Sequence, residues 1–529
     1  MNNIRRSFVT LMAMCLFTFA QARVNIIPQP LSIQEGKGCF KMTGKLGIDC
    51  ADGALLRSAE IFADDMNKVL GISIPVSVNN GGNIKLAIDT TLVKEGYKLI
   101  VTKKKICIDG GSSAGVFYGL QTVKQLLKDG DVPVVTIEDK PHFAYRGTHL
   151  DVARHFFTAE EVKKYIEILA LHKINHFHWH LTDDQGWRIE IKKHPALIEK
   201  GSMRKETVIK KTKVKFDGIP HGGYYTQDEI REMVAFAAER HIVIVPEIDL
   251  PGHMQAALAA YPELGCTGGP YEMRCNWGVS TDVLCAGNEK VYEFLEDVLT
   301  EVCELFPSEM IHIGGDECPK DEWQKCPKCQ AKIAELGLKA SRRFKAEHYL
   351  QNYVMGRVEK FLNSKGRRII GWDEILEGEA SETSTIMIWR NHDQLVKAVR
   401  RGNEVIATDC NYLYLNVYQT YDRSLEPLSM GGYMPMEQVY RYDPYNMLTP
   451  PQREKVIGVQ ANIWAEYIKD FSRVQTALLP RLAALAEIAW AQDRREDFKT
   501  FAEKAKAVLP GLYQSYGYNY SPHFFEGKD

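Results

Sequence analysis

The stretch Met310-Ile311-His312-Ile313-Gly314-Gly315-Asp316-Glu317 is a short apolar run that ends in two glycines and two adjacent acids. An apolar run of this length predicts a strand that is buried on both faces. The glycines allow a tight turn and a close approach of other groups where the strand ends. Asp316 and Glu317 are therefore expected at the C-terminal edge of a strand, where α/β folds place their chemistry. The alternative is a pair of solvated carboxylates, and the rest of the chain decides between the two.

Strand-like runs with polar residues at their ends recur along the chain. There are eight, at 145–151, 174–183, 241–249, 310–317, 367–374, 384–390, 403–416 and 456–466. Helical patterns lie between most of them or after the last, at 158–172, 226–240, 289–306, 341–364, 393–401 and 474–490. Alternating strands and helices imply a parallel sheet, and eight such units predict a (β/α)8 TIM barrel. Residues 375–383 are too few for a full helix, so we expect that crossover to be irregular.

The chain divides into segments of different character. Residues 23–140 contain short strand patterns and two helical patterns, which predict a small α+β domain that supports the barrel. The catalytic barrel is expected to span residues 143–490, and a helical C-terminal tail to span residues 491–529. The fold class is therefore α/β, with a TIM barrel preceded by a small α+β domain.

The N-terminus has the pattern of a secretory signal peptide over residues 1–22. Arg5 and Arg6 precede an apolar stretch, and a small-x-small cleavage site ends at Ala22. We therefore expect an exported protein, either periplasmic or extracellular. A lipid anchor at Cys15 is disfavoured, because Met14 is large where a small residue normally precedes a lipidated cysteine.

Composition excludes several classes of partner. The chain has 529 residues and a formal net charge of −2, which gives no electrostatic case for binding nucleic acid. No later segment approaches the ~18 uninterrupted apolar residues of a membrane-spanning helix. We expect no membrane span, and a homodimer as the candidate assembly.

Twelve cysteines, one of them in the signal peptide, leave an odd number in the mature chain. Cys266, Cys275 and Cys285 lie in one glycine-rich loop and are the best candidates for a disulfide bridge. Cys326 and Cys329 have the Cys-x-x-Cys spacing of zinc and redox sites. Because no second Cys or His pair follows at zinc-finger spacing, we expect a local disulfide or two free thiols there.

The predicted strand ends gather carboxylates, tryptophans and a tyrosine at one end of the barrel. Aromatic faces stack on the apolar faces of a pyranose, and charged side chains form paired hydrogen bonds with its hydroxyls. The collection therefore predicts a sugar site. Its members are Arg146, Asp151, Asp183, Glu247, Asp249, Asp316, Glu317, Trp372, Asp373, Trp389, Tyr414, Asn416, Trp464 and Glu466.

Over nearly the whole mature chain, the sequence resembles glycoside hydrolase family 20, the exo-acting β-N-acetylhexosaminidases. In the small domain the resemblance rests on Ile27-Pro28-Gln29-Pro30 and Gly119-Leu120-Gln121-Thr122. In the barrel it rests on Arg146-Gly147, residues 180–187 (HLTDDQGW), 246–253 (PEIDLPGH) and 312–317 (HIGGDE), Gly371-Trp372-Asp373-Glu374, and Trp464-Ala465-Glu466. The order and spacing of these motifs make the resemblance specific.

The resemblance implies a substrate-assisted mechanism, in which the 2-acetamido oxygen of the substrate attacks its own anomeric carbon. Glu317 is then the general acid and later the base, and Asp316 orients the acetamido group. Glu317 must be protonated and Asp316 ionised, so we expect their environments to separate their pKa values. No third catalytic carboxylate is needed.

Further roles carry over from the family one residue at a time. Tyr414 is expected to donate to the acetamido oxygen, and Trp372, Trp389 and Trp464 to wall the acetamido pocket. Arg146 is expected to bind O3 and O4, and Glu466 to reach O4 and O6. Asp183 and His253 are expected to position the acid pair. For His176, His178 and His180 we expect packing or supporting hydrogen bonds, because the resemblance implies no metal and no cofactor.

One residue departs from the family pattern. Many members have Asp two residues after the phenol, where this chain has Asn416, which carries no charge and adds a hydrogen-bond donor. This substitution favours tolerance of galacto-configured or 6-sulfated residues.

The sequence thus predicts an enzyme that releases non-reducing terminal β-linked GlcNAc or GalNAc from a glycan or oligosaccharide partner by hydrolysis. The alternatives are a relative specific for decorated hexosamines, and a non-catalytic glycan-binding protein on the same scaffold.

Overall fold

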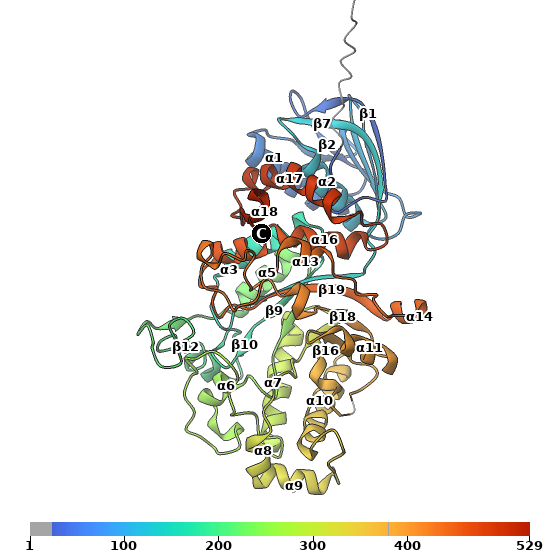
Figure 1. The fold of residues 1–529 in the computed structure, drawn as a ribbon. Coiled ribbons are helices and arrows are strands. Elements are labelled where there is room, and N and C mark those ends of the chain that lie inside the picture. The colour runs from blue at the N-terminus through green and yellow to red at the C-terminus, as the bar shows by residue number, and fades with distance from the viewer. Residues whose placement is uncertain (1–23, 379) are drawn as a thin grey trace, which may run out of the picture.

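The computed structural model describes residues 24–378 and 380–529, so the predicted signal peptide lies outside the described residues. The chain forms a small N-terminal domain and a larger barrel domain beneath it in the view of Figure 1. Among the described residues, no helix combines the length and the apolar character that crossing a membrane requires.

The small domain is one mixed seven-stranded sheet with two helices, as predicted for an α+β domain. The strand order is β1-β7-β5-β6-β4-β2-β3. The strands are β1 (Ser32–Lys41), β2 (Ile48–Cys50), β3 (Val76–Val78), β4 (Ile84–Ile88), β5 (Tyr97–Val101), β6 (Ile106–Gly110) and β7 (Asp131–Asp139). The helices are α1 (Leu56–Leu70) and α2 (Ser113–Leu126).

Eight parallel strands close into the predicted barrel, and the last strand pairs with the first. In chain order they are β8 (Tyr145–Asp151), β9 (His176–His180), β14 (Val243–Glu247), β15 (Met310–His312), β16 (Arg368–Trp372), β17 (Thr385–Ile388), β18 (Val405–Ala407) and β19 (Val456–Ile463). Each falls inside one of the eight strand-like runs. The barrel interior is filled by side chains from alternating strands, including Tyr145, Val245 and Trp372.

Helices follow most of the strands and pack against the barrel. The longer ones are α3 (Ala159–Leu171), α5 (Gln227–Ala238), α7 (Glu289–Leu305), α10 (Ala346–Ser364), α11 (His392–Arg401), α15 (Phe471–Leu478) and α16 (Arg481–Ala491). Local sequence explains where they begin: Thr158 and Glu161 form a capping box at α3. In the described residues of the crossover from β16 to β17, only a 3-10 turn forms, Asp373–Leu376, which confirms the expected irregularity.

One strand boundary differs from the prediction. The run 403–416 was predicted as one strand, but β18 ends at Ala407 and α12 (Cys410–Leu413) follows. Asp409 causes this break, because its side chain accepts from the Asn411 N–H and caps the helix. The C-terminal tail contains α17 (Phe498–Ser515) and α18 (His523–Glu526), and α17 lies beside the small domain in Figure 1, where Lys504 bonds Gln29.

The remaining elements lie in the connections between the barrel strands. They are the hairpins β10 (Thr182–Asp183)/β11 (Gly186–Trp187) and β12 (Met203–Arg204)/β13 (His221–Gly222), and the helices α4 (Ala196–Glu199), α6 (Gln255–Ala260), α8 (Asp321–Lys325), α9 (Pro327–Glu335), α13 (Met436–Tyr440) and α14 (Pro450–Arg453). The loops that carry these elements form the walls of the cavity described next.

Candidate active site

A cavity of about 520 Å³ opens at the C-terminal end of the barrel strands. Asp316, Glu317, Trp389, Tyr414 and Asn416 line it together with Trp464 and Glu466, so most predicted site residues meet there. The lining also contains residues that the sequence analysis did not name: Arg154, Lys210, Lys211, Lys213, Asn276, Trp277, Met430 and Tyr467.

The turn after β15 presents the two acids. Gly314 and Gly315 have φ values of 62° and 98°, which L-residues adopt at a cost in energy. A Cβ on Gly314 would lie 1.6 Å from Oδ1 of Asp249, which accepts a hydrogen bond from the Gly315 N–H at 3.2 Å. Glu317 itself has a φ of 43°. The two glycines are thus required for the chain to turn and place both acids in the cavity.

His253 links the acid pair to the rest of the site. Its Nε2 lies 3.6 Å from Oε2 of Glu317 and 3.8 Å from Oδ2 of Asp316, and its Nδ1 lies 3.2 Å from Oδ1 of Asp183. Burial opposes protonation of His253, but the charge of Asp183 outweighs it and raises the pKa of the imidazole well above its usual range. A charged His253 therefore faces both acids.

The two acids have different environments. Burial raises the pKa of Asp316 to about 6, and the neighbouring charge of Glu317 adds to this shift. The hydrogen bond from His253 lowers the pKa of Glu317, whose side chain is 46% exposed. The environments separate the two pKa values as predicted, but in the opposite order, because Asp316 and not Glu317 is the buried acid.

Aromatic side chains form one wall of the cavity. The rings of Trp389 and Tyr414 are stacked with centroids 6.1 Å apart, and Tyr414 lies 6.3 Å from Trp464. Burial raises the pKa of Tyr414 well above its usual value, so its phenol remains a hydrogen-bond donor. The indole of Trp389 donates to Oε2 of Glu374 at 2.9 Å, which fixes the ring.

Trp372 was predicted to wall the pocket, but it lies behind the cavity lining. Its side chain is 1% exposed, and its indole N–H donates to Oε1 of Glu247 at 2.8 Å. Its ring centroid is 5.9 Å from that of Trp464, which does line the cavity. Trp372 therefore supports Trp464 from inside the barrel.

The histidines of β9 support the site from below, as predicted. His180 bonds Glu247 through Nδ1 and Asp183 through Nε2. Glu247 also faces His178 at 2.9 Å and His312 at 3.0 Å. The bond from His180 holds Asp183, which lies just behind the cavity and contacts Nδ1 of His253.

Arg146 was predicted to bind the sugar, and this prediction is wrong. It lies at the N-terminal end of β8, the end opposite the cavity, and is fully buried between the two domains. Its guanidinium donates to both carboxylate oxygens of Glu95 at 2.9 Å and to the Phe143 carbonyl at 2.9 Å. The Arg-Gly motif therefore marks the domain interface.

Arg154, and not Arg146, lines the cavity. It follows the C-terminal end of β8, bonds Asp183 at 2.7 Å and Asp151 at 3.3 Å, and lies over the ring of Trp464. The signal for it was present in the sequence, since Arg154 comes three residues after the strand-end Asp151. Arg146 lies at the start of this strand, whereas barrel chemistry occurs at the C-terminal ends of the strands.

Glu466 and Asn416 complete the polar lining. Burial raises the pKa of Glu466 to about 7, against the opposing charge of Arg154. Oδ1 of Asp316, Oδ1 of Asn416 and Oε2 of Glu466 are buried and have no hydrogen-bond partner among the described residues. Buried acceptors without partners are costly in a folded protein, so these three atoms are directed at a polar ligand.

The predicted disulfide among Cys266, Cys275 and Cys285 is also not found. All eleven cysteines in the described part of the chain are free thiols. The Cys275 thiol instead donates to the Met273 carbonyl at 3.6 Å.

Comparison with known proteins agrees with this geometry. The family model for the glycosyl hydrolase family 20 catalytic domain matches residues 143–493, and the model for domain 2 of that family matches residues 23–140. A β-hexosaminidase of Porphyromonas gingivalis is 42% identical over 94% of this chain, which spans 64% of that longer protein.

Solved structures show the same relationship. The exo β-N-acetylglucosaminidase of Vibrio harveyi in complex with N-acetylglucosamine is 32% identical, with a TM-score of 0.84 over 94% of this chain and 78% of that one. The N-acetyl-β-hexosaminidase of Streptomyces plicatus is 32% identical, with a TM-score of 0.81 over 94% of this chain and 97% of that one. The chain therefore belongs to glycosyl hydrolase family 20.

Proposed function

We propose that the protein hydrolyses non-reducing terminal β-linked N-acetylhexosamine from glycans, with retention of configuration and with the substrate's own acetamido group as nucleophile. The observation that carries the proposal is the pairing of Glu317 with Asp316, whose Oδ1 is buried and has no partner among the described residues. That oxygen is available to accept a hydrogen bond from an acetamido N–H.

Each group has a defined part in the proposed reaction. The acetamido oxygen bonds to the anomeric carbon while the bond from that carbon to the leaving oxygen breaks, and Glu317 gives its proton to the leaving oxygen. Asp316 holds the N–H and stabilises the positive oxazolinium, and Tyr414 donates to the attacking oxygen. A water then attacks the anomeric carbon, Glu317 takes its proton, and the acetamide re-forms. Intramolecular attack removes the entropy cost of recruiting a nucleophile.

Substrate binding would reverse the pKa order of the two acids. A hydrogen bond from the acetamido N–H favours the ionised form of Asp316 and lowers its pKa. A sugar lying against Glu317 removes water from a side chain that is 46% exposed, which favours its protonated form. The proton required on Glu317 is thus supplied when the ligand arrives.

The test uses 4-nitrophenyl β-N-acetylglucosaminide and the matched β-glucoside, which lacks the acetamido group. We expect turnover of the first only, and a loss of about 10²–10⁴ in kcat/KM for Glu317→Gln. Glu322→Gln, on α8 and outside the cavity lining, is the control and should match wild type. Hydrolysis of the β-glucoside would indicate a protein nucleophile. Equal rates for wild type and Glu317→Gln would favour a glycan-binding protein.

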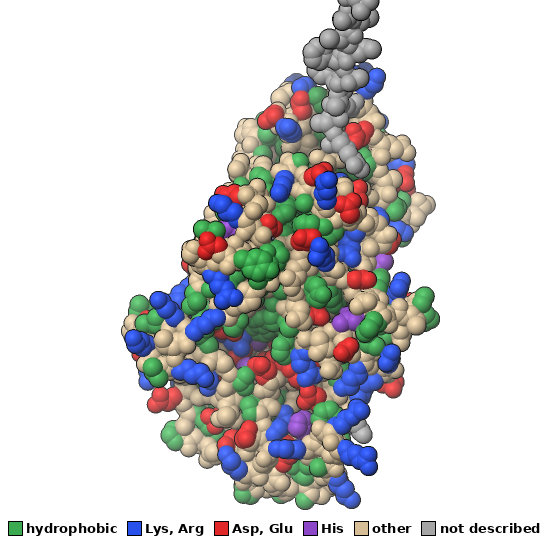
Figure 2. Space-filling model, viewed as in Figure 1, with side chains coloured by type: hydrophobic (Ala, Val, Ile, Leu, Met, Phe, Trp, Pro, Cys, Tyr) green, Lys and Arg blue, Asp and Glu red, His purple; other side chains and the backbone are tan. Residues whose placement is uncertain are grey.

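We also propose a preference for substrates with an anionic substituent near O4 or O6. The uncharged Asn416 lines the cavity, and the rim carries Lys210, Lys211 and Lys213. Figure 2 shows Lys and Arg side chains gathered on the lobe that contains β12, close to these lysines in sequence. A sulfate or carboxylate substituent there would find the positive charge of the lysines, and an uncharged amide in place of a carboxylate at position 416.

This preference is tested by the ratio of rates on 6-sulfated and unsulfated N-acetylglucosaminides. Asn416→Asp and Lys210→Gln/Lys213→Gln should each lower the ratio at least several-fold, and more so at low salt. Lys215→Gln, in the same loop but not in the cavity lining, is the control. An unchanged ratio in Asn416→Asp would remove the basis for the preference.

Finally, we propose that the protein acts outside the cytoplasm, because residues 1–22 have the pattern of a cleaved leader. N-terminal sequencing of the mature protein should begin at or next to Arg23. A mature protein that still begins at Met1 would contradict export by this route.

A further inference from the structure

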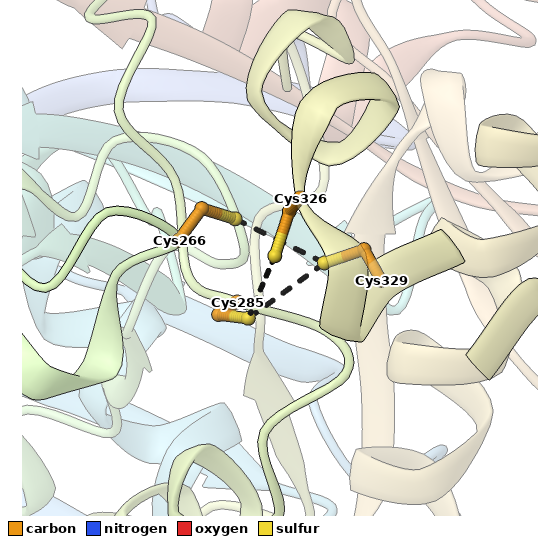
Figure 3. Close-up of side chains that lie close together, drawn as sticks. All are labelled: Cys266, Cys285, Cys326 and Cys329. Carbon is orange, nitrogen blue, oxygen red and sulfur yellow. Dashed lines mark hydrogen bonds between the residues drawn. The ribbon is translucent and has the colours of Figure 1, made fainter. Parts of the chain in front are cut away.

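Four cysteines from the segments that follow β14 and β15 meet in one cluster. Cys266 and Cys285 lie near the two ends of the loop that joins the 3-10 turn Pro262–Leu264 to α7. Cys326 and Cys329 flank the first turn of α9. The sulfur of Cys285 is 3.7 Å from those of Cys326 and Cys329, and the sulfur of Cys266 is 3.9 Å from that of Cys329. All four sulfur atoms lie within 4.8 Å of one another, and in Figure 3 they point toward a common centre.

These distances match a tetrahedral metal site. Zinc binds cysteine sulfur at ~2.3 Å, and sulfur atoms at the corners of such a tetrahedron lie about 3.8 Å apart. A disulfide would require a separation of about 2.05 Å. The four sulfurs are thus spaced as ligands of one ion and not as two bonded pairs.

The surroundings fit a closed site. Cys285 and Cys329 are fully buried, Cys326 is 4% exposed, and Cys266 is partly buried. The backbone N–H of Gly287 is a hydrogen-bond donor toward the sulfurs of Cys285 and Cys329, which is the support that metal-bound thiolates need. A Cβ on Gly287 would lie 2.2 Å from the Lys328 carbonyl oxygen, so only glycine lets the two segments approach this closely.

We propose that Cys266, Cys285, Cys326 and Cys329 bind one structural zinc ion as thiolates. Four protein ligands leave no open position, so the ion has no direct part in the chemistry. Cys326 and Cys329 were not predicted to bind zinc, because no second Cys or His pair follows them at zinc-finger spacing. The second pair lies 41 to 63 residues earlier and is brought near only by the fold.

The site joins two loops that build the active site. The loop closed by Cys266 and Cys285 carries Asn276 and Trp277 into the cavity. The other segment continues directly from Asp316 and Glu317 through α8 to Cys326. Zinc therefore fixes one wall of the cavity relative to the acid pair. In an oxidising compartment it would also protect four adjacent thiols from forming disulfides.

The first test is the metal content of the full chain, purified without a histidine tag. Mass spectrometry of the elements should give one zinc per chain and no stoichiometric iron. Four thiols should become reactive only after chelation and unfolding, and replacement by Co²⁺ should give the spectrum of a tetrahedral tetrathiolate. Chains with intact Cys266–Cys329 and Cys285–Cys326 disulfides, or with iron in place of zinc, would overturn the proposal.

Cysteine variants provide a matched comparison. Cys329→Ser should lose its zinc and unfold at a temperature several degrees lower, whereas Cys275→Ser, in the same loop but outside the cluster, should keep both. If Cys329→Ser does not fold, the zinc and Co²⁺ measurements on the wild-type chain decide. Full zinc content in a folded Cys329→Ser would exclude this ligand set.

Discussion

At the scale of single residues, Asp316 and Glu317 differ because one is buried and the other is open to solvent. With the pKa of Asp316 raised to about 6 and that of Glu317 lowered, the pair carries one proton between the two values. The proposed reaction needs exactly one proton on the pair, which places its working range between these pKa values.

The pH dependence of kcat/KM follows from this arrangement, since kcat/KM reports the free enzyme. Above pH of about 6 the pair loses its last proton, so kcat/KM should fall about tenfold per pH unit. Asp316→Asn leaves Glu317 alone, whose pKa is lowered by His253, so the alkaline limb should move to lower pH while overall activity drops. The measurement is kcat/KM as a function of pH from about 4 to about 9, in steps of about half a pH unit. A limb that stays in place in Asp316→Asn would assign the titration to another group, such as Glu466.

At the scale of elements, the eight strand-like runs were predictable because strands buried on both faces leave continuous apolar runs. Where each strand stops was less clear, as the run 403–416 shows: one Asp409 side chain ends β18 by capping α12. The cavity wall from Lys210 to Trp277 was not predictable, since long loops carry no periodicity and are placed by contacts distant in sequence.

The turn after β15 gives a prediction at this scale. In Gly314→Ala, the new Cβ would collide with Asp249, and the positive φ adds strain, so the acid pair should shift. A displacement near 1 Å reduces rates about 10²-fold, which is the expected loss in kcat/KM. Gly356→Ala is the control, because Gly356 is exposed within α10 and a Cβ there meets nothing within 4 Å. It should keep full activity and gain about 0.5–1 kcal/mol in the free energy of unfolding.

At the scale of the whole molecule, buried ion pairs join the small domain to the barrel. Arg146 bonds Glu95 across the interface, and Lys173 bonds Asp139 at 3.2 Å, where the Trp490 indole also donates at 2.9 Å. The motif that contains Arg146 was recognised from sequence, but its role was not, because a motif does not say which end of a strand faces the ligand.

Substitution of Arg146 should therefore affect the free energy of unfolding, and substitution of Arg154 should affect substrate binding. Arg146→Met should lower the free energy of unfolding by about 3–5 kcal/mol, because Glu95 is left as an unpaired charge, while KM of the folded enzyme stays unchanged. Arg154→Met should raise KM at least several-fold, because Arg154 lines the cavity and holds Asp183. Urea unfolding and Michaelis kinetics on both variants provide the check. An increase in KM for Arg146→Met would instead indicate that Arg146 contributes to substrate binding.

The closure of the barrel has a consequence for how the chain matures. The sheet of the small domain is complete once Asp139 has been synthesised, but β8 finds its partner β19 only when residues 456–463 are available. During synthesis, β8 and β18 are thus open edges that pair with other chains if left unprotected. Trp490 bonds Asp139 and Lys504 of α17 bonds Gln29, so these two contacts of the small domain also require residues that follow β19. A ribosome stalled before residue 456 would release a chain with a finished sheet and an unfinished barrel, which is a natural substrate for chaperones and proteases.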